Sequence, residues 1–251
     1  MTAFLNPVIE EPTAITIPEG IEWLDPKPAH ELTPSLKLRL NKALYGLRQA
    51  PRLWYKDLAT TLTTLGISPS SSDLNLFLSQ LRRMIILLYV DYILLCAQGN
   101  AVAHLDEVKT ALKSKYQIRD LGPAQQYLGI TIRQSPTQII LAQSPYVLTL
   151  LKRFGLQDCN GHLTPLVSGS RTKTESPPLP PAEIKTYQAI VGGIMYLMLA
   201  TRPDLAYSIS VLSKHAANPQ EHHLGMAKRV LCYLKETAVT GMGYFMVSSI
   251  G

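Results

Sequence analysis

Length, composition and charge restrict the kind of protein that this chain can be. It has 251 residues, 46% hydrophobic and 17% charged, which allows one large core or two smaller ones and argues against disorder throughout. The net charge of +6 permits a polyanionic partner but does not demonstrate one. The three cysteines are scattered, and neither a signal-peptide pattern nor an apolar run of membrane length is found. We therefore expect a soluble intracellular protein without a membrane partner, in the cytoplasm or the nucleus.

Periodicity and capping residues predict an alternation of strands and helices. Trp54 and Leu58 begin an apolar stripe at helical spacing, and Asn100, Ser144 and Asn218 stand where helix caps are expected. The predicted elements are extended segments over 1–36, a helix over 51–65, a strand over 74–78, a hairpin over 84–97, a helix over 100–116, strands over 127–132 and 138–141, and helices over 144–154, 187–199, 202–216 and 218–234.

A proline-rich segment divides the chain. Residues 165–183 contain five prolines together with Ser, Thr and Gly, a composition typical of linkers. We expect a boundary there between residues 1–164, which mix strands and helices, and residues 184–251, which are mainly helical.

Asp91 interrupts an apolar run of fourteen residues from Met84 to Ala97 that carries no other charge. A lone carboxylate is costly to bury, so Asp91 must reach water, a partner group or a metal ion. Two short strands meeting at a tight turn would bury the flanks and present Asp91 at the tip. A solvated turn residue is the alternative reading of Asp91 taken by itself.

Several segments together resemble the copia-type retrotransposon reverse transcriptase. The resemblance covers nearly the whole chain in the family's order, and this ordered set is far more specific than any single block. The segments are Ala3–Asn6, Ile9–Glu11, Pro18–Gly20, Leu44–Tyr55, Tyr89–Tyr92, Asp120–Gly122, Tyr127–Ile130, Thr201–Tyr207 and Lys228–Lys235.

The resemblance implies an α+β right-hand polymerase fold. Residues 1–164 would form part of the fingers and palm and the start of the thumb, with a hairpin-bearing antiparallel sheet. Residues 184–251 would form a helical thumb or connection segment. The implied activity is RNA-directed DNA polymerase, which uses an RNA or DNA primer–template, deoxynucleoside triphosphates and two Mg²⁺ ions, with Mn²⁺ as a substitute.

The family's catalytic carboxylates are incomplete in this chain. Asp91 matches the first Asp of the hairpin pair and would be the catalytic and metal-binding residue, but the second position is Tyr92, a poor Mg²⁺ ligand. The family's third Asp would fall two positions before Met1. We therefore expect impaired catalysis. Compensation would require Glu10, Glu11 or Asp73 at the tip, and nothing in the sequence places any of them there.

The best nucleic-acid-binding candidate is the segment 37–56, which has six basic residues and no acidic one. Arg52 and Lys56 are four apart on the predicted helix and would share a face that contacts phosphates. The resemblance puts Gln49 at the incoming-nucleotide pocket and Arg48 at the template or triphosphate. The alternatives are a solvated helix face for the basic residues and a helix-start role for Gln49.

Three residues are candidates for the primer side. Tyr89 would lie near the primer end or in the core, with the core slightly favoured, and Tyr127 and Gly129 would grip the primer backbone or form a strand with a packing glycine. For Lys228, Arg229 and Lys235, a solvated helix face is favoured over duplex contact.

Four functional hypotheses follow from these residues. The chain is an RNA-directed DNA polymerase with an unseen compensation, a noncatalytic nucleic-acid-binding remnant, a partner subunit that pairs with an intact copy, or a relic of the element without a role.

Overall fold

The computed structural model describes residues 3–16, 37–79, 83–167, 176–238, 240 and 242–245, and the chain divides into two units, residues 1–122 and 123–251. Both units combine helices with antiparallel sheets, so the α+β class is confirmed. None of the helices in these described ranges is long and apolar enough to cross a bilayer.

The first unit contains a two-stranded sheet, a four-stranded sheet and two main helices. The four-stranded sheet has the order β3-β4-β5-β6 with antiparallel neighbours, and β1 pairs with β2 in a separate sheet. The elements are η1 Ala3–Leu5, β1 Val8–Thr16, β2 Lys37–Lys42, α1 Ala50–Thr64, β3 Ser68–Pro69, β4 Leu76–Ser79, β5 Met84–Tyr89, β6 Tyr92–Ala97, η4 Gly99–Val102 and α2 Ala103–Lys115.

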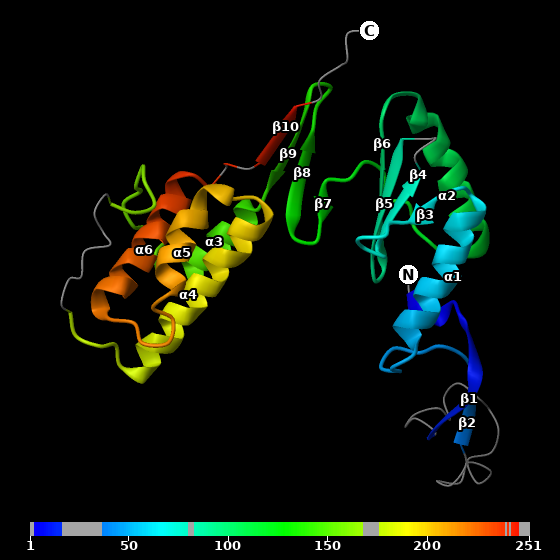
Figure 1. Ribbon diagram of the computed structural model, residues 1–251, viewed down its shortest axis with the longest axis horizontal. Helices are drawn as coiled ribbons and strands as arrows, with labels where there is room; N and C mark the ends of the chain where they lie inside the picture. Colours follow the sequence, from blue (N-terminus) through cyan, green and yellow to red (C-terminus); the bar gives the residue numbers. More distant parts are fainter. Residues whose placement is uncertain are drawn as a thin grey trace. The chain divides into compact units, whose positions relative to one another are not determined.

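Alternating burial along β5 explains why the sheet forms where it does. Met84, Ile86 and Leu88 point to one face of the sheet and are buried, while Ile85 and Tyr89 on the other face are exposed. The buried face packs against α1 and α2, which lie on the same side of the sheet (Figure 1). This pattern is expected for an antiparallel sheet with one face in the core.

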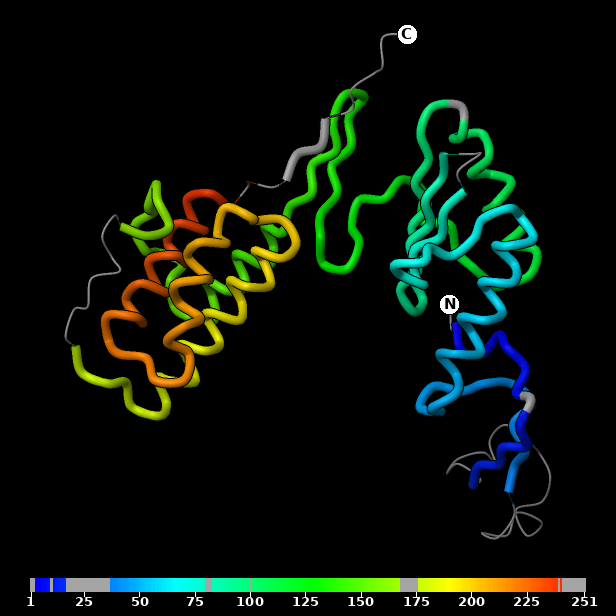
Figure 2. The backbone as a smooth tube through the Cα atoms, in the orientation of Figure 1, coloured from blue at the N-terminus to red at the C-terminus, as the bar shows by residue number. Residues whose placement is uncertain are grey.

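The second unit contains another four-stranded antiparallel sheet, of order β10-β9-β8-β7, and a group of four helices around one apolar core (Figure 2). The elements are β7 Gln126–Tyr127, β8 Ile130–Gln134, β9 Gln138–Ala142, α3 Ser144–Arg153, α4 Pro181–Ala200, η5 Pro203–Leu205, α5 Ala206–Ser213, α6 Glu221–Glu236 and β10 Met242–Phe245.

Close packing and buried polar contacts join the helices of the second unit. A Cβ at Gly193 on α4 would lie 2.8 Å from Leu150 Cδ2, so glycine permits the close approach of α3. The buried hydroxyl of Tyr187 on α4 donates to the Leu212 carbonyl oxygen of α5 at 2.6 Å. Burial raises the pKa of Tyr187 to about 12, so this hydroxyl keeps its proton and remains a donor.

Arg202 links two of the sequence blocks that carry the resemblance. Its guanidinium is almost fully buried and donates from Nε and Nη2 to the two carboxylate oxygens of Asp204, at 2.9 and 2.8 Å. It also donates to the carbonyl and hydroxyl oxygens of Thr237, just after α6. Tyr233 of α6 donates to Asp204 Oδ2 at 2.9 Å. The blocks 201–207 and 228–235 therefore meet in one hydrogen-bonded cluster.

Several predicted helix boundaries were wrong. Asn100 lies in η4, and α2 begins three residues later. The helix expected from Tyr187 begins at Pro181, because proline needs no hydrogen-bonded N–H at a first helical position and Glu183 follows in the first turn. The cap of α6 is Gln220 rather than Asn218, and it forms a capping box with His223.

Candidate functional site

The predicted hairpin is confirmed, and its turn has an unusual backbone. β5 and β6 stay paired as far as Tyr89 and Tyr92, so only Val90 and Asp91 form the turn. Val90 has a φ of 50°, which is rare for a β-branched residue and normally favours Gly or Asn at this turn position. The indole N–H of Trp54 on α1 donates to the Val90 carbonyl oxygen at 3.0 Å. This contact from the helix holds the turn in place.

The carboxylate of Asp91 is held by two other segments of the chain. The Tyr45 hydroxyl lies 2.8 Å from both carboxylate oxygens, and the Ala3 backbone N–H donates to Oδ1 at 3.1 Å. The Phe4 ring packs on Tyr45 with centroids 4.6 Å apart. Burial, followed by the hydrogen bond and negative charge of Asp91, raises the pKa of Tyr45. The hydroxyl therefore stays protonated and serves as a donor to Asp91.

The residues at this tip do not fit a two-metal centre. Mg²⁺ takes oxygen ligands in octahedral geometry and needs anionic oxygens to bind a pair of ions. At the tip, Asp91 supplies one carboxylate, and both of its oxygens face the Tyr45 hydroxyl. The adjacent Tyr92 is a neutral phenol. Within the described ranges, no three His, Cys, Asp or Glu side chains are grouped so as to hold a metal ion.

The three acidic residues considered for compensation are on other elements. Glu11 is an exposed residue of β1, and the side chain of Glu10 lies outside the described residues. Asp73 is in the loop before β4, where its carboxylate accepts a hydrogen bond from the Asn75 backbone N–H at 2.9 Å. This contact gives Asp73 a local turn-forming role.

Tyr89 and Tyr92 face each other across the strand pair, immediately next to the turn. Their side chains are 54% and 57% exposed, so the expectation that Tyr89 belongs to the core is wrong. The tip therefore presents one hydrogen-bonded carboxylate beside two exposed phenol rings.

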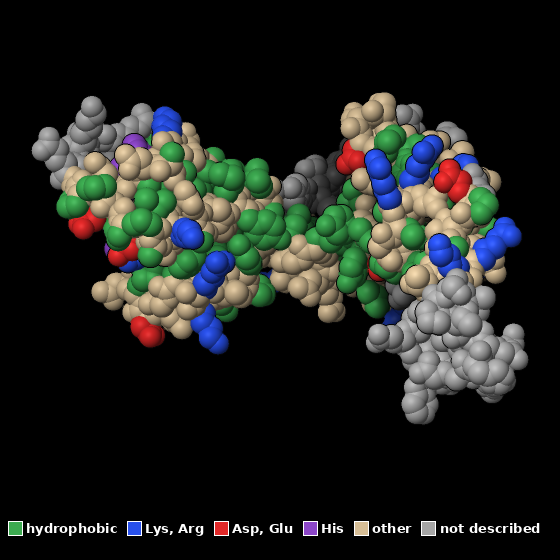
Figure 3. All heavy atoms as spheres, turned by 90° about the horizontal axis from the view of Figure 1, so that it is seen from below, with side chains coloured by type: hydrophobic (Ala, Val, Ile, Leu, Met, Phe, Trp, Pro, Cys, Tyr) green, Lys and Arg blue, Asp and Glu red, His purple; other side chains and the backbone are tan. Residues whose placement is uncertain are grey.

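The candidate nucleotide- and template-binding residues lie at the start of α1. Arg48, Arg52 and Lys56 are exposed, and lysines and arginines are visible on the surface in Figure 3. Gln49 occupies the N-cap position of α1, and its Nε2 donates to the Thr13 hydroxyl of β1 at 3.2 Å. The helix-start position of Gln49 is thus confirmed, and its side chain ties the helix to β1.

Tyr127 ends β7, and Gly129 lies in the turn of the β7–β8 hairpin in the second unit. Leu128 and Gly129 have φ of 49° and 81°, the pattern of a type I′ turn. The Tyr196 hydroxyl of α4 donates to the Leu128 carbonyl oxygen at 3.3 Å. A Cβ at Gly129 would lie 3.3 Å from that hydroxyl oxygen, so Gly129 packs closely on Tyr196. The single strand expected over 127–132 is wrong, because Leu128 and Gly129 form a turn between β7 and β8.

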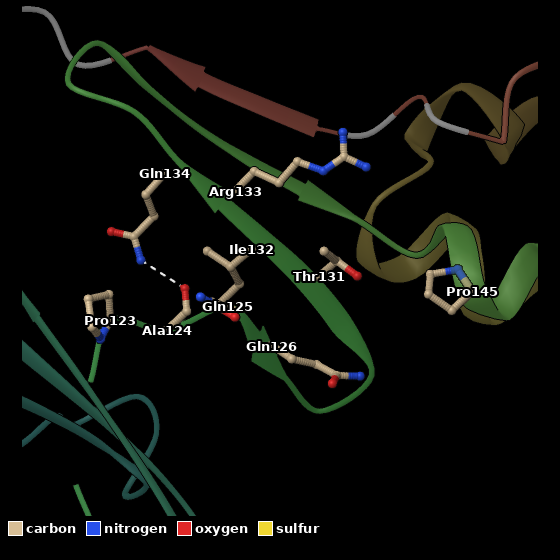
Figure 4. Close-up of a pocket in the computed structure, with 9 residues that line it drawn as sticks. All are labelled: Pro123, Ala124, Gln125, Gln126, Thr131, Ile132, Arg133, Gln134 and Pro145. Atoms are coloured by element: carbon tan, nitrogen blue, oxygen red, sulfur yellow. Dashed lines mark hydrogen bonds between the residues drawn. The ribbon is translucent and has the colours of Figure 1, made fainter. Parts of the chain in front are cut away.

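A hollow of about 660 Å³ lies beside this hairpin (Figure 4). Its lining combines three amides, one hydroxyl and one guanidinium with four apolar residues. The Gln134 amide donates to the Ala124 carbonyl oxygen at 2.9 Å. The lining residues are Pro123, Ala124, Gln125, Gln126, Thr131, Ile132, Arg133, Gln134 and Pro145.

The C-terminal basic residues serve mainly as internal contacts. Arg229 donates toward the His162 ring and the Thr164 hydroxyl, and Lys235 donates to the Cys159 carbonyl oxygen at 2.8 Å. These bonds attach the segment after α3 to α6, whereas Lys228 is exposed.

Sequence reasoning missed the residues that hold Asp91. Tyr45 and Ala3 lie 46 and 88 positions away from it, so no local spacing predicts that they meet. The one indication in the sequence is that Tyr45 lies inside the Leu44–Tyr55 block that carries the family resemblance.

Comparisons with known proteins show which family the chain is similar to. Residues 1–168 match the family described as reverse transcriptase (RNA-dependent DNA polymerase). The chain is 35% identical over 242 residues to the retrovirus-related Pol polyprotein from transposon RE2 of Arabidopsis thaliana, covering 96% of this chain and 16% of the relative. It is 32% identical over 246 residues to the Pol polyprotein from transposon TNT 1-94 of Nicotiana tabacum, covering 94% and 18%.

A shorter relative is the putative transposon Ty5-1 protein of Saccharomyces cerevisiae, 32% identical over 240 residues, with 94% of this chain and 74% of the relative covered. No solved structure matches the chain. The chain spans only about a sixth of the length of the two plant polyproteins. The family match and these relatives show that the chain belongs to the copia-type reverse transcriptases.

Proposed function

We propose that this chain is a reverse transcriptase fragment that retains primer–template binding and is impaired in DNA synthesis. The observation that carries the proposal is the hairpin tip, where Asp91 is tied to Tyr45 and the neighbouring position is Tyr92. Nucleotide addition needs anionic oxygens that clamp two metal ions, and a single carboxylate supplies too little ligand charge.

The proposal includes the polymerase architecture. Residues 1–164 would form part of the fingers and palm and the start of the thumb, and residues 184–251 a helical thumb or connection segment. Residues 165–183 would form the linker, whose last three residues already belong to α4. The four-stranded sheet with its acidic hairpin tip, backed by α1 and α2, supports the palm assignment. An intracellular location, with Mg²⁺ and deoxynucleoside triphosphates as the ancestral requirements, follows from the same assignment.

The proposed nucleic-acid contacts are made by exposed basic residues near the tip. Arg48 follows Tyr45 by three residues, and Arg52 precedes Trp54 by two, while Tyr45 and Trp54 both contact the turn. Basic side chains on these segments would reach phosphates without reading sequence, so binding should weaken steeply with salt.

Primer extension tests the catalytic part. The chain is incubated with a primed homopolymer template, deoxynucleoside triphosphate and Mg²⁺ or Mn²⁺, and we expect no extension above background. Steady extension that disappears in Asp91→Asn would refute the impairment.

A gel-shift titration tests the binding part. We expect a complex with a primer–template duplex at low salt, weakened several-fold by the double substitution Arg52→Gln and Lys56→Gln. Lys113→Gln is the matched control, because Lys113 is an exposed cation of the same unit that pairs with Asp120 on the surface. If no complex forms even at low salt, the chain has lost binding as well as synthesis.

A further inference from the structure

The outward face of the β5–β6 hairpin is apolar and carries no charge. Three cross-strand pairs share the face that points away from α1 and α2, and every member is exposed or half-buried. The pairs are Ile85 with Cys96, Leu87 with Leu94, and Tyr89 with Tyr92. The face therefore ends in two phenol rings at the turn.

Both rings are available to an external partner. Tyr89 and Tyr92 are more than half exposed, and in the described part of the chain neither ring contacts another aromatic ring nor forms a hydrogen bond. By contrast, Phe4, Trp54 and Tyr45 on the other side of the tip are all engaged in internal contacts. The two rings thus form an exposed surface that makes no aromatic contact or hydrogen bond within the described part of the chain.

The tip that carries these rings is held rigidly. Trp54 fixes the Val90 carbonyl from α1, Tyr45 fixes the Asp91 carboxylate, and Ala3 fixes the same carboxylate from η1. Three separate segments therefore set the position of a two-residue turn. A preorganised aromatic surface loses little conformational entropy on binding a ligand.

Charge and ring chemistry favour an unpaired nucleobase as the occupant. Every base offers a π face that stacks on a tyrosine ring, whatever its sequence. The exposed Arg48 and Arg52 lie on the two segments that contact the tip, where they can bind the adjoining phosphates.

We propose that Tyr89 and Tyr92 form a stacking platform for unpaired bases of a single-stranded nucleic-acid segment. The platform deepens the proposed nucleic-acid binding and rests on it. Tyr92 has a positive role in this proposal: the residue that replaces a carboxylate enlarges the aromatic surface and removes a negative charge that would repel the strand.

The test uses a DNA duplex with a single-stranded 5′ overhang that contains 2-aminopurine, and a blunt duplex of equal length. Stacking on a tyrosine ring quenches the fluorescence of 2-aminopurine, so the probe reports the contact itself. For Tyr92→Leu and for Tyr89→Leu we expect affinity for the overhang duplex to fall about tenfold, with loss of quenching and unchanged affinity for the blunt duplex. Tyr92→Phe, which keeps the ring, should behave as the wild type.

The outcomes separate this proposal from the proposed function. If the wild type does not bind the blunt duplex, the proposed duplex binding is refuted. The platform would still be supported if the wild type quenches a free single-stranded probe and Tyr92→Leu does not. Wild-type quenching by a correctly folded Tyr92→Leu variant would overturn the platform. An equal loss of affinity for both duplexes in Tyr92→Leu would also overturn it. So would a result in which Tyr92→Leu changes the self-association of the protein, measured by light scattering, while its nucleic-acid binding is unchanged.

Discussion

Replacing Asp204 by Asn tests the buried cluster that joins α6 to the start of α5. Asp204 accepts three hydrogen bonds, two from the Arg202 guanidinium and one from the Tyr233 hydroxyl. The Asn side chain keeps the shape but turns an NH₂ group toward at least one of these donors. It also removes the negative charge beside the buried guanidinium, which keeps as acceptors one amide oxygen and the two oxygens of Thr237.

The expected loss of stability follows from the exposure of the two partners. Removing one partner of a fully buried ion pair costs about 3–5 kcal/mol. The Arg202 side chain is only 2% exposed, but that of Asp204 is 39% exposed, so water can replace part of the lost interaction. We therefore expect the free energy of unfolding to fall by about 2–3 kcal/mol. For the second unit this corresponds to a fall of about 10 °C in the midpoint of thermal unfolding.

Thermal and urea unfolding followed by circular dichroism measure this loss. Asp158→Asn is the control, because Asp158 is an exposed carboxylate of the same unit and its replacement should change stability by less than about 0.5 kcal/mol. A change that small in Asp204→Asn would refute the reasoning.

The pH dependence gives a second readout of the same cluster. Burial alone would raise the pKa of Asp204, but the hydrogen bonds from Arg202 and Tyr233 outweigh it and lower the pKa below 3.8. The ionised carboxylate therefore stabilises the fold above pH 3.8, and this contribution disappears as the pH falls through the lowered pKa. The difference between wild type and Asp204→Asn should shrink over the same acidic range.

Three further predictions concern other contacts. Burial and the two neighbouring histidines lower the pKa of His223 from 6.5 to about 4. The stability that this group contributes above pH 6.5 should therefore fall by up to about 3 kcal/mol as the pH drops toward 4. Urea unfolding measures this fall, and His223→Gln should not show it. Trp54→Phe removes the donor to Val90 and should cost about 1–3 kcal/mol, whereas unchanged stability would deny that this bond holds the turn. Gly129→Ala should cost about 1–2 kcal/mol in thermal unfolding, because φ is 81° and the new Cβ would lie 3.3 Å from the Tyr196 hydroxyl; a neutral result would contradict the type I′ turn.

The sequence predicted those features that depend on local pattern. The hairpin around Asp91 followed from a lone charge in an apolar run, and the helix after Pro51 followed from its apolar stripe. The start of α4 at Pro181 was missed because a proline-rich segment resembles a linker whether or not its last proline begins a helix. The cap of α6 was missed because the imidazole of His223 accepts the backbone bond that a Glu usually accepts, and Gln220 is an uncommon cap.

The contacts of the candidate site could not be predicted from the sequence, because they join distant segments. Nothing in the sequence near Asp91 indicates that Tyr45 occupies both of its carboxylate oxygens. The exposure of Tyr89 was misjudged for a related reason. A tyrosine in an apolar strand is usually buried, but its side of the sheet is left uncovered by α1 and α2.

The residues that carry the family resemblance are largely those that hold the fold together. The Leu44–Tyr55 block provides Tyr45 and Trp54, which bind the hairpin turn, and the two C-terminal blocks meet through Arg202. Such residues are constrained by their internal partners, so resemblance at these positions indicates architecture. By contrast, Tyr92 at the hairpin tip is exposed and has no internal hydrogen bond among the described residues. Its replacement should therefore disturb the fold little, which is why the proposed function treats the chemistry at the hairpin tip separately from the architecture.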